Sequence, residues 1–435
     1  MFQAPMRHVK FNLACGSLSD RISFSCMTLT WKLALIAALA AVCLSGNPAA
    51  GAAGEQSSGP APGVHSETNG RCPSPDDLEA ALGKASTLMG QTHYQDAAET
   101  LQSLSGMGCD ARVSLLLAAA FEAGGDVAKA TEVLQQAHSA WPSNNSIAAS
   151  LAREYLTSGQ VDKAVTALAH FHVTAETPQQ EMEMAVVVYL AAHQLVSAQA
   201  VAEAVYKTYP SVHTLLLLAN ALQLQGRYPD VNRLLGSKRG TYADSPEFFI
   251  TLAESEFDAS IYPAAREDLE HAIALDTKSY QAHYLLGNVL FRLNDADRAV
   301  AEYRLAIDLA PDQPRTYFQL ALALRSKQDE AGEERVLEQA LAADDHYAPA
   351  QCEMGRILLE EHRPADAVSH LSSAVQYNPR SEEAYFLLAK AYAGLGEKDK
   401  SDEMVKRLVT VRKENRPSSE DKNGNHPAAN QATIP

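Results

Sequence analysis

The stretch that decides the fold is residues 280–312, which read YQAHYLLGNVLFRLNDADRAVAEYRLAIDLAPD. In its first part, 280–293, large apolar side chains recur every three or four residues, which is the spacing of an amphipathic helix and not of a strand. A second helical pattern covers 297–309 and stops before Pro311. Small residues such as Gly287 occur where the two helices must come close. The stretch therefore predicts a helical hairpin that cannot bury its apolar face alone.

The same pattern recurs along the chain at intervals of 33 or 34 residues. Leu286-Gly287, for example, returns as Leu320-Ala321 and then as Met354-Gly355. Repetition of this kind predicts stacked hairpins in which each unit packs on its neighbours. We predict ten units, which begin near residues 78, 111, 145, 179, 212, 246, 280, 314, 348 and 382.

A helix–turn–helix unit of this length and residue order resembles the tetratricopeptide repeat family. The resemblance covers about 78–412, although His283 and Gln351 stand where the family favours Trp or Tyr, and Glu333 replaces a small residue. It implies an all-α solenoid, a right-handed superhelix whose concave groove is lined by the first helix of each unit. It implies binding and names no ligand.

The residues before the repeats resemble an export signal. Lys32 precedes an apolar run at 33–44, and small residues follow at Ala50 to Ala52. We expect a leader at 1–52, with Met27 as an alternative start, and a protein that is periplasmic or secreted. The alternative is an uncleaved anchor, although a run of twelve is short for a membrane span.

The flanking segments have compositions unlike the repeats. Residues 53–76 are expected to be a flexible linker, 77–412 the superhelix and 413–435 a disordered tail. In the last helix, Met404, Val405 and Leu408 are expected to face inward, leaving a polar outer side that ends the stack.

Composition limits the partners. The formal charge is −17, from 36 basic and 53 acidic residues. Such a surface disfavours nonspecific binding of nucleic acid or anionic lipid. We therefore expect no nucleic-acid partner, and membrane association only through an uncleaved leader. The oligomeric state is left open.

No arrangement of residues points to catalysis. The chain lacks HExxH, CxxC, G-x-S-x-G and Gly-rich phosphate-loop motifs. His362 and His370 flank a turn and a helix start without a metal-ligand spacing. We expect no enzyme activity, no cofactor and no metal.

The leading functional hypothesis is a non-enzymatic, exported scaffold that binds protein or peptide partners in its groove. One alternative is an accessory protein of polysaccharide or envelope export and assembly, and another is an enzyme with an unrecognised site. The resemblance places the groove on the first helices. The side chains expected there are Tyr284, Asn288, Arg292, Arg315, Phe318, Arg325, Arg356, Phe386 and Lys390.

This set combines cations and aromatic rings within an acidic protein, which favours an acidic or C-terminal carboxylate-bearing peptide. In that interpretation Asn288 holds the peptide backbone. The alternative is that Arg325 and Arg356 pair with Asp329 and Glu360 one turn further along their helices.

Two further features are local. Cys72 and Cys109 fall at the same end of the first hairpin, so they are expected to form a disulfide in an oxidising compartment, against two free thiols. Gly236 and Gly240 predict a helix stop and a loop at about 236–244. This loop is either a hinge or a tolerated irregularity.

Overall fold

The structure is a computed structural model that describes residues 72–105 and 108–415. All regular elements in these ranges are α-helices, twenty of them, and no strand is present there. The chain divides into two compact units, which are described separately. The described part of the N-terminal unit ends at Ser255, and that of the C-terminal unit begins at Glu256.

The helices of the N-terminal unit are α2 (Pro75–Gly90), α3 (Tyr94–Ser105), α4 (Ala111–Ala123), α5 (Val127–Ala140), α6 (Asn145–Thr157), α7 (Val161–Ala167), α8 (Gln179–Ala191), α9 (Leu195–Thr208), α10 (Val212–Leu224) and α11 (Tyr228–Gly236). The unit boundary falls within α12 (Pro246–Asp258). The C-terminal unit continues with α13 (Tyr262–Leu275), α14 (Tyr280–Arg292), α15 (Ala296–Leu309), α16 (Pro314–Ser326), α17 (Glu330–Ala343), α18 (Ala348–Glu360), α19 (Pro364–Tyr377), α20 (Glu382–Gly394) and α21 (Lys398–Glu414).

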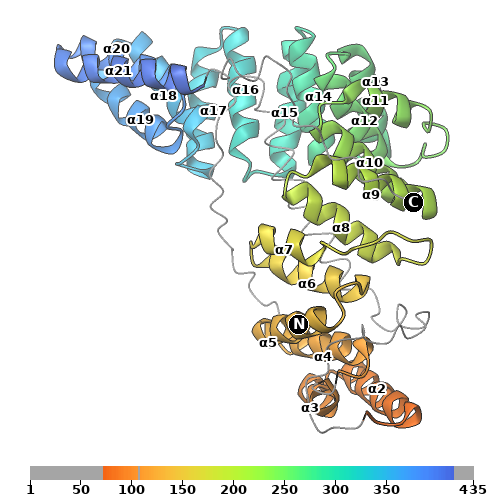
Figure 1. Cartoon of the computed structure of the whole chain (residues 1–435). Helices are drawn as coiled ribbons and strands as arrows, with labels where there is room; N and C mark the ends of the chain where they lie inside the picture. Colours follow the sequence, from red (N-terminus) through yellow and green to blue (C-terminus); the bar gives the residue numbers. More distant parts are fainter. Residues whose placement is uncertain (1–71, 106–107, 416–435) are drawn as a thin grey trace. The chain divides into compact units, whose positions relative to one another are not determined.

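Within each unit, consecutive helices form hairpins that stack in chain order (Figure 1). In the C-terminal unit α14 packs on α15, α16 on α17, α18 on α19 and α20 on α21. The second helix of one hairpin also packs on the first helix of the next, as α15 does on α16. The all-α solenoid predicted from the repeat is confirmed.

Close approach of the two helices in a hairpin depends on small residues. A Cβ atom added to Gly287 would lie 2.6 Å from the ring of Tyr303, which is fully buried. A Cβ atom on Gly355 would lie 2.4 Å from Leu371. A large side chain of the second helix therefore fills the space that the glycine leaves open on the first.

Each hairpin turn contains one residue with a left-handed backbone. These residues recur at the repeat interval, and they are Thr92, Gly125, Gly159, His193, Gly226, Ser260, Asn294, Gln328, His362 and Gly396. The left-handed conformation ends the first helix and reverses the chain. Six of the ten are not glycine, so the turn is imposed by packing of the hairpin as well as by local preference.

The fourth residue of several first helices connects its helix to the preceding loop. Tyr317 Oη donates to the carbonyl of Pro311 (3.0 Å), and Gln351 Nε2 donates to that of Asp345 (2.7 Å). His283 Nε2 lies 3.3 Å from the equivalent carbonyl, at Thr277. His283 and Gln351 replace the Trp or Tyr of the resembled family. Each still places a side-chain nitrogen near the same loop carbonyl that Tyr317 contacts in its own repeat.

Two of these residues also pair across their hairpin. His283 Nδ1 lies 2.7 Å from Glu302, and in the hairpin two repeats on, His370 Nδ1 lies 2.7 Å from Gln351 Oε1. The hydrogen bond to Glu302 raises the pKa of His283, against the effect of burial. Burial lowers the pKa of His370. The same pair of facing positions therefore holds a histidine on the first helix in one repeat, where the charged form is favoured. Two repeats on, it holds a histidine on the second helix, where the neutral form is favoured.

Two second helices are short. The helix α11 ends at Gly236, as the glycine pair predicts, and turns follow up to α12. The helix α7 has only 7 residues, which the sequence analysis did not anticipate. The chain after α7 is held by Asn145, whose side chain donates to the carbonyl of His172 (2.6 Å) and accepts from its N–H (3.1 Å). The hinge proposed near Gly236 stays a prediction.

The last helix differs from expectation. Leu408 and Val411 are buried, but Val405 is 46% exposed and Val409 is 61% exposed. The expectation that Val405 faces inward beneath a wholly polar outer side is therefore wrong. Leu371, at the equivalent position of α19, is fully buried: it packs on Gly355 of α18, and α20 also packs against α19. Among the described residues no helix follows α21 to cover Val405 in the same way.

A disulfide joins Cys72 and Cys109, with 5.8 Å between their Cα atoms. It connects the residues before α2 to those after α3, as hairpin geometry leads one to expect. Among the described helices none has the length and apolar character needed to cross a bilayer. The residues expected to form the leader (1–52), and most of those expected to form the linker and the tail, lie outside the described residues.

The opposite pKa shifts of the two histidines predict separate titrations. In an NMR titration, the His283 ring should titrate above the unperturbed value of about 6.5 and the His370 ring below it. Because the folded pKa of His283 is raised, its contribution to stability is complete below about 6.5 and is lost as the pH rises through the folded value. The contribution of His370 is present above about 6.5 and is lost as the pH falls. Identical midpoints for the two rings would contradict this assignment.

Candidate functional site

The side chains that the sequence placed in the groove come from four first helices of the C-terminal unit. They are Tyr284, Asn288 and Arg292 on α14, Arg315, Phe318 and Arg325 on α16, Arg356 on α18, and Phe386 and Lys390 on α20. We call this set the first-helix face. Its members differ widely in exposure and in the partners that they already have.

Two members are buried. Tyr284 is 4% exposed and stacks on Tyr280 with 5.9 Å between ring centroids. Asn288 is 6% exposed, and its Oδ1 accepts a hydrogen bond from Tyr303 Oη at 2.8 Å. Its Nδ2 lacks a hydrogen-bond partner among the described residues. The prediction that Asn288 presents its amide to a peptide backbone is therefore corrected: the side chain mainly supports the buried hydroxyl of Tyr303.

Carboxylates neutralise two of the five cations. Arg325 pairs with Glu353, and Arg356 pairs with Glu333 (2.6 Å), Glu353 (2.9 Å) and Glu360 (2.6 Å). The alternative considered for Arg356, pairing with Glu360, is confirmed. For Arg325 the expected partner Asp329 is wrong. Asp329 instead caps α17 by accepting from the N–H of Gly332 (3.0 Å).

This ion network lies partly inside the protein. Glu333 is 3% exposed at the position where most units have a small residue. Burial, together with the charge of Glu353, raises the pKa of Glu333 to about 7, even though Arg356 acts in the opposite direction. Burial alone would lower the pKa of Arg356, but its hydrogen bonds to Glu353 and Glu360 raise it overall. The network therefore links α16, α17 and α18, and both arginines already have carboxylate partners.

Arg315 is in a different situation. Its Nε donates to Tyr280 Oη (3.2 Å), and its guanidinium lies 4.8 Å from the centroid of the Tyr284 ring. No carboxylate in the described part of the chain forms an ion pair with it. The Tyr280 hydroxyl is positioned by a 2.8 Å hydrogen bond to Thr316. Arg315 is thus a half-buried cation fixed over tyrosine rings, with its charge not neutralised by an acidic residue.

The remaining members are accessible. Phe318 is half-buried and packs edge-on against Tyr347, with 6.0 Å between centroids. Arg292 is exposed and donates to Tyr262 Oη at 3.0 Å. Phe386 is 57% exposed, and Lys390 follows it one turn later on α20. Of the nine predicted residues, these, Arg315 and the ion-paired Arg325 keep surface that a partner can reach.

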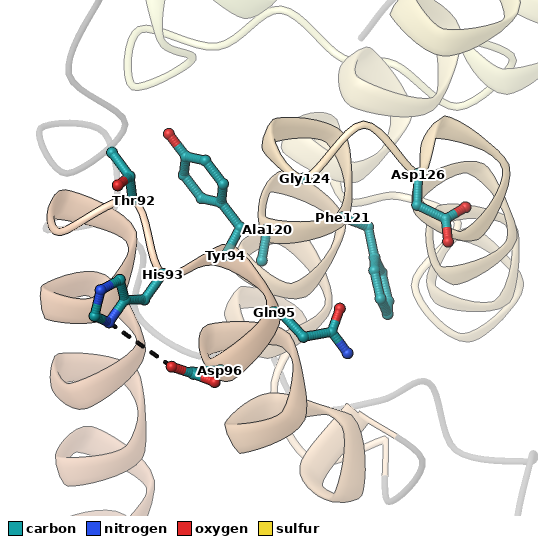
Figure 2. A pocket seen from close by; sticks show the side chains of 9 residues that line it. All are labelled: Thr92, His93, Tyr94, Gln95, Asp96, Ala120, Phe121, Gly124 and Asp126. Atoms are coloured by element: carbon teal, nitrogen blue, oxygen red, sulfur yellow. Dashed lines mark ion pairs between the residues drawn. The ribbon is translucent and has the colours of Figure 1, made fainter.

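The N-terminal unit has an open pocket of about 340 Å³ at the turns of its first two hairpins (Figure 2). Tyr94 and Phe121 line it together with the turn residues, and His93 Nδ1 lies 3.7 Å from Asp96. Both members of that pair are more than half exposed. The pair resembles an ordinary surface contact, because catalytic pairs lie closer together and are shielded from water.

A second polar cluster lies between α17 and α18. Ligand atoms of Asp344, Asp345 and His346 all lie within 4.8 Å of one another, and two of the three residues are exposed. The half-buried His370 has its Nδ1 2.7 Å from Gln351 Oε1.

Comparison with known proteins identifies the repeat. Tetratricopeptide repeat models match residues 82–145 and 250–314, and a further tetratricopeptide repeat model matches 358–417. The chain therefore contains tetratricopeptide repeats.

Among curated proteins, the BBSome complex member BBS4 of Bos taurus is 22% identical over 207 residues. The match covers 46% of this chain and 38% of that relative's length. Among solved structures, a tetratricopeptide repeat protein from Parabacteroides merdae is 13% identical with a TM-score of 0.43, covering 55% of this chain and 97% of that one. YrrB, described as a repeat protein with an unusual peptide-binding site, is 17% identical with a TM-score of 0.35, covering 41% and 92%.

The ion network predicts that its two arginines differ in structural importance. Replacing Arg356 by Met leaves Glu333 and Glu353 without their shared buried partner, and should lower the free energy of unfolding by about 3 kcal/mol at pH 8. Replacing Arg325, whose side chain is 46% exposed, by Met should lower the free energy of unfolding by about 1 kcal/mol or less. Urea unfolding of both variants measures the difference.

The loss in Arg356→Met should be smaller at pH 5.5. The folded pKa of Glu333 is about 7 and above its unfolded value, so protonation below that pH removes the unpaired charge. Equal losses for the two variants, independent of pH, would contradict the network as described.

Proposed function

We propose that this chain, which contains tetratricopeptide repeats, is a non-enzymatic scaffold that binds a protein or peptide on its first-helix face. Proteins built from these repeats are generally scaffolds without catalytic activity. The geometry adds support, since the described polar clusters are either exposed pairs or ion networks inside the stack. Two cations of the first-helix face, Arg315 and Arg292, contact tyrosine rings and form no ion pair within the described residues, and Arg315 is the half-buried one of the two.

Arg315 is the observation that carries the proposal. Arg325 and Arg356, on the same face, each have a carboxylate partner. Arg315 instead rests on tyrosine rings, and its guanidinium retains the capacity for forked hydrogen bonds. A carboxylate is the group that fits this arrangement, either on an acidic side chain or at the end of a peptide.

The neighbouring rings favour a peptide ligand. Phe318 lies three residues from Arg315 on α16, so an apolar side chain beside the carboxylate can pack on it. The alternative of a polysaccharide-handling role has less support, because stacking on sugars requires exposed aromatic faces and Tyr284 is buried. Phe386 alone exposes a large aromatic surface on the first-helix face.

The test is a binding assay on the full chain with a panel of labelled peptides that carry acidic residues or a free C-terminal carboxylate. Arg315→Ala should weaken the best peptide by about tenfold to a hundredfold, the effect of a hydrogen bond to a charged group. Amidation of the peptide terminus should have a similar effect if that carboxylate is the one bound. Fluorescence anisotropy measures the dissociation constants.

Arg325→Ala is the matched control, because it removes an arginine from the same helix whose charge Glu353 already neutralises. This control should leave the affinity for the peptide nearly unchanged. Arg315→Lys should bind the peptide more tightly than Arg315→Ala but less tightly than the wild type. Equal losses for Arg315→Ala and Arg325→Ala, or none for either, would overturn the proposal.

The proposed location is outside the cytoplasm. The leader at 1–52 has the composition of an export signal, and the Cys72–Cys109 disulfide is of a kind that is rare in reducing compartments. A fusion of residues 1–60 to alkaline phosphatase should be active in cells, and deletion of 27–52 should abolish that activity. A cytoplasmic fusion, or Cys72 and Cys109 both alkylated without reductant, would contradict export.

A further inference from the structure

The outer side of α21 has an apolar stripe at the end of the C-terminal unit. Val405 and Val409 lie one turn apart and are 46% and 61% exposed. They are accompanied by polar residues and not by other large apolar ones. Leu408 and Val411 are buried, and Ser401 donates to the carbonyl of Ala389 on α20 (2.9 Å). These contacts fix the orientation of α21, and Val405 and Val409 lie beside the face that packs on α20, where they stay exposed.

Comparison of α21 with the equivalent helix of the preceding repeat, α19, indicates what can pack on the stripe. Val405 occupies the position of Leu371 in α19, which is fully buried: Leu371 packs on Gly355 of α18, and α20 packs on the same helix. Helical packing against this side is therefore the arrangement that the preceding hairpin already uses. A helix with a small apolar stripe is the element that fits α21.

The chain itself narrows the choice of that helix. Residues 416–435 contain a single large apolar residue, Ile434, and so lack an apolar stripe of their own. At the other end of the repeats, α2 buries Leu82 and Ala85 and has no large apolar residue in its exposed set. The outer side of α2 is thus polar, which disfavours head-to-tail stacking of copies. Within the described residues α15 also exposes an apolar pair one turn apart, Leu305 and Leu309, so the choice of a second α21 rests on the charges beside its stripe.

The charged residues beside the stripe favour the pairing of α21 with α21 of a second copy. Asp402, Val409 and Lys413 follow one another at intervals of seven and four residues, so they lie along one edge of the helix. Asp402 and Lys413 are exposed, and neither forms an ion pair within the described residues. They are about 16 Å apart along the axis, too far to pair with each other in one helix. In an antiparallel pair of α21 helices that sets Val405 against Val409, Asp402 of one copy comes beside Lys413 of the other.

We propose that the chain forms a two-fold symmetric dimer in which α21 packs antiparallel on α21 of a second copy. The contact is isologous, because the same stripe serves both copies, and it closes without leading to a filament. Its small apolar area places it among weak, reversible associations. The second copy takes the place that a following hairpin would occupy.

Sedimentation velocity of the full chain over a range of micromolar concentrations tests the proposal. The wild type should change from monomer to dimer as the concentration rises. Val409→Glu should raise the dissociation constant at least tenfold by placing a charge at the centre of the contact. The matched control is Val196→Glu on α9, a valine that is 77% exposed, which should leave the association unchanged.

Exchanging the charges of residues 402 and 413 tests whether the two α21 helices pack antiparallel. Asp402→Lys and Lys413→Asp should each weaken the dimer, and the double variant should recover the wild-type dissociation constant. Recovery arises only between copies, since the two residues cannot meet within one helix. A monomer at every concentration, a dimer unaffected by Val409→Glu, or a double variant weaker than both single variants would each overturn the proposal.

Discussion

The structure depends on one constraint: a helical hairpin leaves an apolar face that only the next hairpin can cover. Within a hairpin, the two helices come close because Gly287 and Gly355 leave room for Tyr303 and Leu371. Between hairpins, the second helix of one repeat packs on the first helix of the next. The constraint is met throughout the interior of each unit and remains unmet at α21, where Val405 and Val409 face outward. The exposed apolar side chains on α21 are therefore explained by the lack of a following hairpin among the described residues.

The same constraint explains how the chain tolerates residues that depart from the repeat pattern. His283 and Gln351 replace an aromatic residue but keep a hydrogen bond to the preceding loop. Glu333 replaces a small residue, and Arg356 from the next hairpin compensates its charge. An isolated polar group at such a position would be costly, whereas a paired one is accepted and links neighbouring repeats. The polar substitutions thus occur together with partners one or two elements away.

Sequence was sufficient for the helices, their pairing and the solenoid class, because a 34-residue period reports packing directly. It was less informative about the candidate site. The repeat register put Asn288 and Arg356 on the first-helix face, but it did not show that Tyr303 and three glutamates already contact them. Those contacts come from neighbouring helices, and their distances depend on how the helices pack. The shortness of α7 was missed because Asn145, far along the chain, holds the loop that replaces the last turns. Residues 1–71 and 416–435, which include the segments expected to be the export signal and most of the tail, lie outside the described structure.

The central claim is that a partner contacts the first-helix face beside Arg315. A photoreactive amino acid placed at Phe318 in the full chain tests it most directly, with the same group at Leu305 on α15 as a control that is 46% exposed on a second helix. Irradiation in an envelope extract should give a discrete protein adduct from position 318, none from position 305, and a strongly reduced yield when Arg315→Ala is also present. An adduct of equal yield from both positions, or one from position 318 that is indifferent to Arg315→Ala, would contradict the account.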